Sequence, residues 1–263
     1  MKLNLVPARS GALWVKLGIS TFFKQPLAMA GLFFMFMALM TVATMVPLVG
    51  LPLAMTLLPA ATLGLMAATL EVTQGKFPMP QVLLAGLRAR SGTARALLIL
   101  GAIYASGFLI AMGLAYLVDG GGFVRMYMGG QAPAKEVLES SGFIAAMWTF
   151  IGLHLPLSLL LWHAPALVYW QGVSPVKSLF FSVVACLRNF KAYVLFALCW
   201  MGVMMTVLLV VITLAGLLDN PELIGVILFP ALMLVASMFF TSLYFSYRDC
   251  FAVDSPTTET PTA

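Results

Sequence analysis

Between Lys24 and Glu71 the chain reads QPLAMAGLFFMFMALMTVATMVPLVGLPLAMTLLPAATLGLMAATL, a run of 46 residues without a charged side chain. About 20 apolar residues suffice to cross the hydrocarbon core of a bilayer as a helix, so this run is long enough for two spans. Its middle, Pro47-Leu48-Val49-Gly50-Leu51-Pro52, contains prolines, which lack an amide donor and disfavour helix at the preceding residue. We expect a turn there, between helices over about residues 27–47 and 51–71.

Four further charge-free gaps hold 23, 37, 27 and 25 residues and predict one helix each, near residues 96–118, 143–170, 192–218 and 223–247. Of the 263 residues, 62% are hydrophobic and 9% are charged, whereas a soluble domain is about half apolar and about a quarter charged. The sequence therefore predicts an all-α polytopic membrane protein of six transmembrane helices. We expect a single transmembrane domain over residues 1–253 and a disordered cytoplasmic tail over residues 254–263.

Basic residues gather before the first span, between the second and third, between the fourth and fifth, and after the sixth. Twelve of the fourteen lie in these segments, which leaves Arg125 and Lys135 on the other side. The positive-inside rule then places both termini on the cytoplasmic side of a bacterial inner membrane. Because the charges are spread over four juxtamembrane segments, they favour anionic lipid headgroups over nucleic acid as the partner. The candidate headgroup-contacting residues are Lys16, Lys24, Arg88, Arg95, Lys177, Arg188 and Lys191.

An internal repeat is suggested by Gln74-Gly75-Lys76-Phe77-Pro78 and Gln171-Gly172-Val173-Ser174-Pro175, which match at an offset of 97 residues. The same offset pairs Leu58-Pro59 with Leu155-Pro156, and Pro230 has a similar place in the sixth helix. We therefore expect three pseudo-repeats over about residues 9–71, 78–170 and 175–250, each an interfacial helix followed by a helical hairpin. The alternative is a coincidence between similar helix-plus-hairpin segments.

The basic segments 9–25, 78–95 and 175–191 are the predicted interfacial helices. In the first, Lys16, Ser20 and Lys24 recur at a spacing of four residues and so share one helix face, while Trp14 and Phe22 face elsewhere. This pattern is typical of a helix in the headgroup layer with its lysines toward phosphate. The alternative is a set of loop helices that pack on one another.

Two parts of the chain carry a family resemblance. The first part contains Val6-Pro7-Ala8-Arg9 and Trp14-Val15-Lys16. The second contains Trp162-His163-Ala164-Pro165-Ala166-Leu167, which leads into Lys177-Ser178-Leu179-Phe180-Phe181-Ser182. They resemble an uncharacterised family of multi-spanning inner-membrane proteins of Gram-negative bacteria. The resemblance extends nearly to Phe251 but brings no activity, so it implies no functional residue. In architecture alone the chain is loosely similar to the membrane domain of some glycerophosphodiester phosphodiesterases.

The polar side chains inside the expected spans are few and uncharged. The candidates are His154, Ser158, His163 and Thr241. Either histidine is expected to be neutral and bonded to another helix or to a carbonyl freed by a proline, and the alternative makes His163 a headgroup or proton-handling residue. The sequence has no GxSxG, HExxH or P-loop motif, so we predict no enzymatic activity, cofactor or metal.

Other residues are expected to have structural roles. Small residues at spacings of four, Ala60-Gly64-Ala68, Gly101-Ala105 and Gly107-Ala111, predict close helix packing. Arg188-Asn189 and Arg248-Asp249 stand where spans meet the cytoplasm, and they suit helix-end anchoring better than phosphate binding. The stripe Ser237, Thr241, Tyr244 and Arg248 predicts a seam of hydrogen bonds between helices.

Together these features favour a non-catalytic membrane protein, a partner, assembly or lipid-organising component. The spans contain no Asp, Glu, Lys or Arg, and coupled transporters usually place such a residue in the bundle interior. The alternative is a transporter or permeability pathway for a small or amphipathic solute, because proline-broken helices at repeat interfaces can form binding sites at the membrane midplane.

Overall fold

A computed structural model describes residues 3–89, 91–129, 133–220 and 222–251. Over these ranges the chain forms helices and no strand. In chain order the elements are α1 (Ser10–Phe22), α2 (Pro26–Thr44), α3 (Gly50–Thr73), the 3-10 helix η1 (Pro80–Leu84), α4 (Ala85–Arg88), α5 (Ser91–Asp119), α6 (Gly122–Gly129), α7 (Lys135–Leu138), α8 (Ser141–Leu161), α9 (Ala164–Gln171), α10 (Pro175–Arg188), α11 (Phe190–Leu217) and α12 (Glu222–Cys250).

Six segments of the described chain are long and apolar enough to cross a membrane, namely α2, α3, α5, α8 together with α9, α11 and α12. Their number and order confirm the six predicted spans and the all-α membrane class. Pro59, Pro156 and Pro230 lie inside α3, α8 and α12. The second span of each expected hairpin therefore contains a proline, as predicted.

The turn between the first two spans lies where the prolines place it. The first span, α2, ends at Thr44 rather than near residue 47, because helix is disfavoured at the residue that precedes Pro47. Leu48 adopts a positive φ of 67° and is fully exposed. The second span, α3, then begins at Gly50.

The fourth predicted span, residues 143–170, is divided into two helices. It breaks after Leu161, and α9 begins at Ala164 with Pro165 in its first turn. The Ser182 hydroxyl donates to the Leu159 carbonyl at 2.7 Å and accepts the His163 amide at 2.9 Å. In an unbroken helix these two backbone groups would bond to each other, so the serine of α10 is inserted into the hydrogen-bond ladder and fixes the break.

The second predicted interfacial helix, residues 78–95, is not one helix. It forms the short elements η1 and α4, and Ser91 already opens α5. Pro80 begins η1, and a Cβ on Gly64 of α3 would lie 2.6 Å from the Leu83 backbone. The tight packing of this segment on α3 accounts for its short elements. Residues 9–25 and 175–191 do form helices, as α1 and α10.

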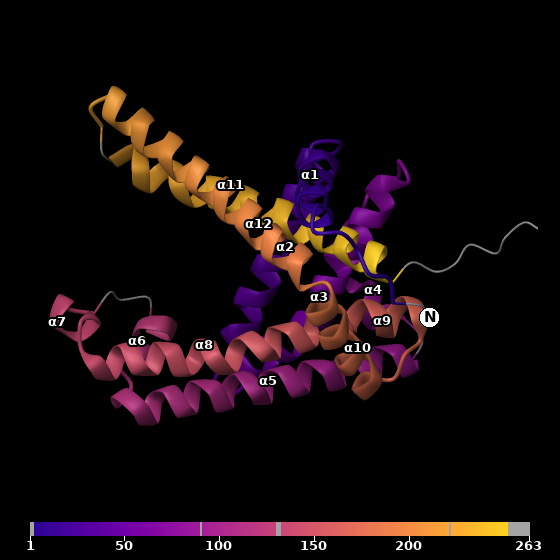
Figure 1. Cartoon of the computed structure of the whole chain (residues 1–263), viewed down its shortest axis with the longest axis horizontal. Coiled ribbons are helices and arrows are strands. Elements are labelled where there is room, and N and C mark those ends of the chain that lie inside the picture. The colour runs from indigo at the N-terminus through magenta and orange to yellow at the C-terminus, as the bar shows by residue number, and fades with distance from the viewer. Residues whose placement is uncertain (1–2, 90, 130–132, 221, 252–263) are drawn as a thin grey trace, which may run out of the picture. The chain divides into compact units, whose positions relative to one another are not determined.

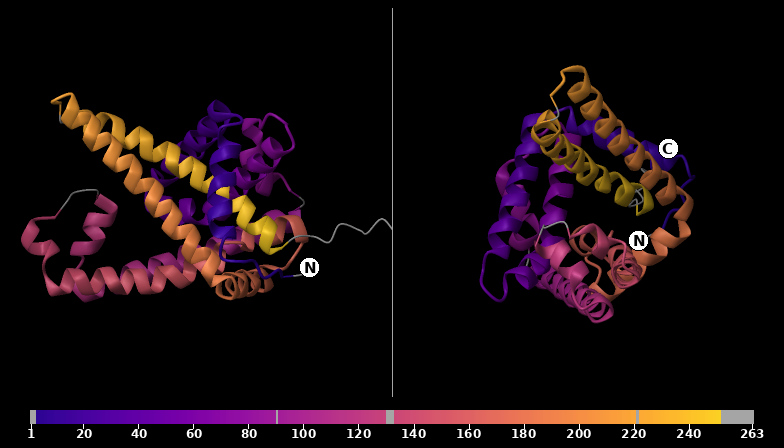
Figure 2. Two further views of the ribbon diagram at one scale, coloured as in Figure 1. Left: turned by 45° about the horizontal axis from the view of Figure 1, so that its top comes forward. Right: turned by 90° about the vertical axis from the view of Figure 1, so that its left-hand side faces the viewer.

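The described chain forms two compact units, whose boundaries fall within α2, α3, α4 and α10. The first unit contains Met1–Met37, Thr62–Ala85 and Val184–Ala263, and in it α1 packs on both α11 and α12. The second contains Ala38–Ala61 and Gly86–Val183, and there α5 and α8 lie side by side (Figure 1). Both views of Figure 2 show α11 beside α12.

The predicted small-residue positions are sites of close packing. A Cβ on Gly101 would collide with the Thr56 carbonyl of α3, and a Cβ on Gly107 would lie 2.9 Å from the Leu157 side chain of α8. Ala60 and Ala68 are buried on α3. These helices therefore approach one another through their smallest residues, as helices without a hydrophobic driving force between them do.

The matched Gln-Gly pairs have the same local structure. Gly75 and Gly172 follow the ends of α3 and α9 and have φ values of 75° and 65°, so both end a helix in the left-handed region that glycine tolerates. The larger pseudo-repeat and the single domain over residues 1–253 stay predictions. The expected tail, residues 254–263, lies outside the described residues.

Candidate lipid-contacting surface

The N-terminal helix α1 is held tightly against α11 and α12 at two glycines. A Cβ on Gly11 would collide with the Ala192 carbonyl of α11, and a Cβ on Gly18 would lie 2.5 Å from the Ser242 Cβ of α12. No larger residue fits at either position without displacing a neighbouring helix. One face of α1 is therefore fixed on the α11–α12 pair.

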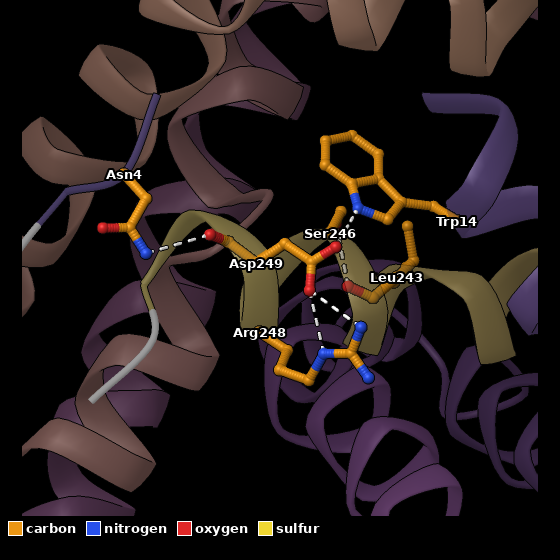
Figure 3. Close-up of polar contacts among 6 residues, drawn as sticks. All are labelled: Asn4, Trp14, Leu243, Ser246, Arg248 and Asp249. Atoms are coloured by element: carbon orange, nitrogen blue, oxygen red, sulfur yellow. Dashed lines mark hydrogen bonds and ion pairs between the residues drawn. The ribbon is translucent and has the colours of Figure 1, made fainter. Parts of the chain in front are cut away.

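Trp14 fixes the rotation of α1 about its own axis. Its side chain is 0% exposed and lies with its ring centroid 5.3 Å from that of Tyr193. The indole Nε1 donates to Asp249 Oδ2 at 2.8 Å, and the other carboxylate oxygen accepts from Arg248 Nε at 2.8 Å (Figure 3). Asp249 therefore neutralises Arg248 and holds Trp14 at the same time, which supports the helix-end role predicted for Arg248-Asp249.

The segment that precedes α1 is bound by Asn189, at the corner between α10 and α11. The Asn189 side chain accepts the Val6 amide at 2.8 Å and donates to the Asn4 carbonyl at 3.1 Å. The Asn4 amide in turn donates to the Cys250 carbonyl at the end of α12, at 2.9 Å. Buried Asn189 and the backbone bond from Asn4 to Cys250 thus hold the segment before α1 against α11 and α12, and the membrane-surface anchoring expected for Arg188-Asn189 stays a prediction.

The outer face of α1 carries the predicted headgroup candidates. Lys16 and Ser20 are exposed one helical turn apart, and Lys24 is exposed just beyond the end of the helix. Trp14 is two residues from Lys16, which is 200° around an ideal helix. Because Trp14 points inward, Lys16 necessarily points outward, as the sequence predicted.

The helix α10 has an unusual distribution of side chains. Val176 and Phe180 are 74% and 64% exposed, whereas Ser178 and Ser182 are completely buried. Lys177 stands beside the exposed apolar residues. The helix thus presents an apolar face with a flanking basic charge to its surroundings, and it uses its hydroxyls inside the protein.

The remaining candidates of this group are exposed as well: Arg88 at the end of α4, Arg95 in α5, Arg188 at the end of α10, and Lys191 in α11. All seven predicted headgroup-contacting residues are therefore accessible. Whether they lie in the cytoplasm depends on the orientation of the chain, which stays a prediction.

The intramembrane candidate His154 lies in an aromatic cluster of the second unit. Its ring stacks on Phe150 at 5.0 Å, and the rings of Phe108 and Tyr104 lie at 5.9 and 6.1 Å. Its Nδ1 atom is buried without a hydrogen-bond partner among the described residues. His154 thus packs among aromatic rings of α5 and of its own helix, and the expected bond to another helix or to a freed carbonyl stays a prediction.

His163 lies at the break between α8 and α9 and is 0% exposed. A completely buried ring does not reach a lipid headgroup, so the headgroup role suggested for His163 is wrong, and its proton-handling role stays a prediction. Its backbone amide donates to the Ser182 hydroxyl. In the sequence Pro165, two residues after His163, indicates a break near this point. The sequence did not indicate that Ser182 takes part in it.

The two hydroxyl candidates bond to their own helices. Ser158 donates to the His154 carbonyl at 2.9 Å, and Thr241 donates to the Ser237 carbonyl at 2.8 Å. They belong to different compact units. In the predicted hydrogen-bond seam of α12, the Ser237 hydroxyl donates to another helix, to the Met29 carbonyl of α2 at 3.3 Å.

Within the described residues no group of three or more His, Cys, Asp or Glu could hold a metal ion.

A curated protein of Burkholderia thailandensis, named "probable inner membrane protein", is 33% identical over 259 residues, which is 97% of this chain and 96% of the relative. The chain belongs to the family of that protein. With its six apolar helices, this member of the family is a multi-span membrane protein. No family model and no solved structure matches the chain, so the architectural similarity to glycerophosphodiesterase membrane domains stays a prediction.

Proposed function

We propose that this inner-membrane family member is a non-catalytic protein that binds and organises anionic phospholipid at the cytoplasmic face of the membrane. The observation that carries the proposal is the distribution of side chains on α10. A helix that exposes Val176 and Phe180, buries its serines and keeps Lys177 at the edge of the apolar face has the chemistry of a helix that lies in the headgroup layer.

The basic residues of the other segments support the same role. Each Lys or Arg close to an anionic membrane surface contributes about 1 kcal/mol of attraction, which corresponds to about a fivefold local enrichment of anionic lipid. Seven exposed basic residues on several helices act on the lipids around the protein together. Because Asp249 neutralises Arg248 within the protein, Arg248 is left out of this set.

Lipid composition around the protein tests the proposal. The full chain is extracted with its surrounding lipids in polymer-bounded discs, and the ratio of anionic to zwitterionic phospholipid is compared with that of the bulk membrane. We expect enrichment of anionic lipid, and a reduction of this enrichment by about half or more in the double variant Lys177→Gln with Arg188→Gln. Val176→Ser with Phe180→Ser should weaken it too, because the helix then loses its hold on the acyl region.

The matched control is Lys135→Gln with Arg125→Gln, which removes two basic residues on the other side of the predicted topology. The control should reduce the enrichment in the discs less than the α10 double variant does. Equal lipid ratios in the discs and in the bulk membrane would show the proposal to be wrong.

A further inference from the structure

The α1–α11 groove is an apolar hollow of about 700 Å³ in the first compact unit, a size typical of small-molecule and lipid sites. Its walls are one face of α1 and one face of α11. The residues that line it are Ala12, Val15, Lys16, Ile19, Ser20, Cys199, Gly202, Val203, Thr206 and Val207.

The hollow exists because Gly202 has no side chain at its floor. A Cβ added to Gly202 would meet no atom within 4 Å, so the space above this glycine is open. One helical turn further along, the Thr206 hydroxyl donates to the Gly202 carbonyl at 2.8 Å. The threonine thus presents its methyl group, and the floor remains apolar.

Polar groups stand along one edge of the groove. Lys16 and Ser20 lie on successive turns of α1. No described residue forms an ion pair with the Lys16 ammonium. An exposed, unpaired ammonium group close to the headgroup layer attracts an anionic headgroup, so the groove has a place for one negative charge next to a place for a hydrocarbon chain.

We propose that the α1–α11 groove holds one anionic phospholipid molecule. One acyl chain lies over Gly202, Val203 and Val207, and the phosphate accepts hydrogen bonds from the Lys16 ammonium. The Ser20 hydroxyl donates to the Leu17 carbonyl at 3.1 Å and lies at the same edge of the groove. The inference rests on the proposed function for its lipid class, and it adds a defined site with one lipid per chain to the general attraction of the basic surface.

The charge of the groove favours a lipid over a second copy of the chain. The acidic residues of the span helices, Glu71, Asp119, Glu222 and Asp249, lie in first or last turns, and Asp249 already pairs with Arg248. The apolar middle of a helix from another copy that entered the groove would therefore bring no acid to neutralise Lys16. A phospholipid brings both the anion and a flexible chain that follows an irregular apolar wall.

Native mass spectrometry of the full chain in mild detergent, with anionic phosphatidylglycerol and zwitterionic phosphatidylethanolamine supplied in equal amounts, tests the site. We expect one retained phosphatidylglycerol per chain. Gly202→Leu fills the floor and should reduce this occupancy at least tenfold. Gly216→Leu is the matched control, because Gly216 is an exposed glycine of the same helix, outside the groove, where an added Cβ also meets no atom within 4 Å.

Cys199 supplies a second readout because it lines the groove. Added phosphatidylglycerol should slow alkylation of Cys199 several-fold in the unchanged chain and in Lys16→Arg. The protection should be lost in Lys16→Ala.

The inference is overturned if Gly202→Leu keeps its lipid, if Gly216→Leu loses it equally, or if the two lipids bind equally. It is overturned as well if a dimer or a free fatty acid occupies the groove. Gly202→Leu leaves every basic residue in place. If this variant loses the bound lipid but keeps the enrichment of anionic lipid in the discs, the groove site is distinguished from the general attraction of the basic surface. The opposite result, no enrichment but one retained lipid, contradicts the proposed function and leaves the site standing.

Discussion

Asp249 is the residue at which the contacts of α1 and α12 meet. It accepts from the Trp14 indole and pairs with Arg248, whose guanidinium also lies 5.0 Å from the Phe245 ring. Trp14→Phe keeps most of the ring packing but removes the donor. Since hydrogen bonds to charged groups contribute about 1.5–3 kcal/mol, we expect this variant to lower the free energy of unfolding by that amount in reversible detergent–SDS titrations.

A double-mutant cycle makes this expectation specific. If the bond is what matters, Trp14→Phe and Asp249→Ala are not additive, and their coupling energy accounts for most of the single-variant loss. Trp148→Phe is the control, because that side chain is 62% exposed and no described acidic residue accepts a hydrogen bond from it. Additive effects at Trp14 and Asp249 would contradict the bond.

The cysteines differ in the environment of their thiols. Burial, with a smaller contribution from the nearby Cys250 thiol, raises the pKa of Cys186 to about 12. At pH 9 its thiolate fraction is therefore about one in a thousand. We expect Cys186 to resist alkylation in the lipid-free folded protein up to pH 9 while Cys199 reacts, as mapped by peptide mass spectrometry. Reaction of Cys186 at the rate of an SDS-unfolded control would contradict its burial.

The same raised pKa affects stability with a defined sign. The folded thiol keeps its proton between its ordinary pKa, near 9, and about 12, whereas the unfolded thiol loses it. The contribution of Cys186 to stability is therefore complete below pH 9 and is lost as the pH rises toward 12. Replacement by alanine should flatten the alkaline part of the stability curve.

At the scale of elements, the break between α8 and α9 depends on a serine of a third helix. Ser182→Ala leaves the Leu159 carbonyl and the His163 amide without their partner, and an unsatisfied buried group costs about 1–3 kcal/mol. We expect this loss in unfolding titrations, together with faster hydrogen exchange at His163. Ser158→Ala is the control, since that hydroxyl donates only to its own helix and its loss should cost a few tenths of a kcal/mol at most. Equal effects of the two variants would contradict the bridging role of Ser182.

The elements also show where sequence reasoning stops. Charge-free gaps locate spans because a charged residue is excluded from the hydrocarbon core whatever its neighbours are. The division of the fourth span depends on Ser182, 23 residues from Leu159, and the anchoring of Val6 depends on Asn189, 183 residues away. Such contacts form only when distant segments pack together, so a local sequence pattern does not predict them. The groove has the same origin, because Gly202 reads as an ordinary apolar-helix glycine until α1 is placed beside it.

At the scale of the whole molecule, the basic residues predict the orientation of every span. Twelve of the fourteen lie in segments assigned to the cytoplasm, and such a bias sets the topology of short-loop membrane proteins. A fluorescent protein that folds only in the cytoplasm, fused after Phe251, should therefore fluoresce. Alkaline phosphatase, which is active only outside, should be active when fused after Gly129 at the end of α6 and inactive after Phe251.

Partial removal of the charges tests the physical cause of this orientation. Lys16→Gln with Lys24→Gln leaves ten of the twelve basic residues in place, and because the bias counts the positive residues of all short loops together, the topology should not invert. Loss of lipid binding in this variant with both fusions unchanged would separate the role of α1 in lipid contact from its role in insertion. An active phosphatase after Phe251 in the unchanged chain would instead place the basic surface, and with it α10 and the α1–α11 groove, on the periplasmic side.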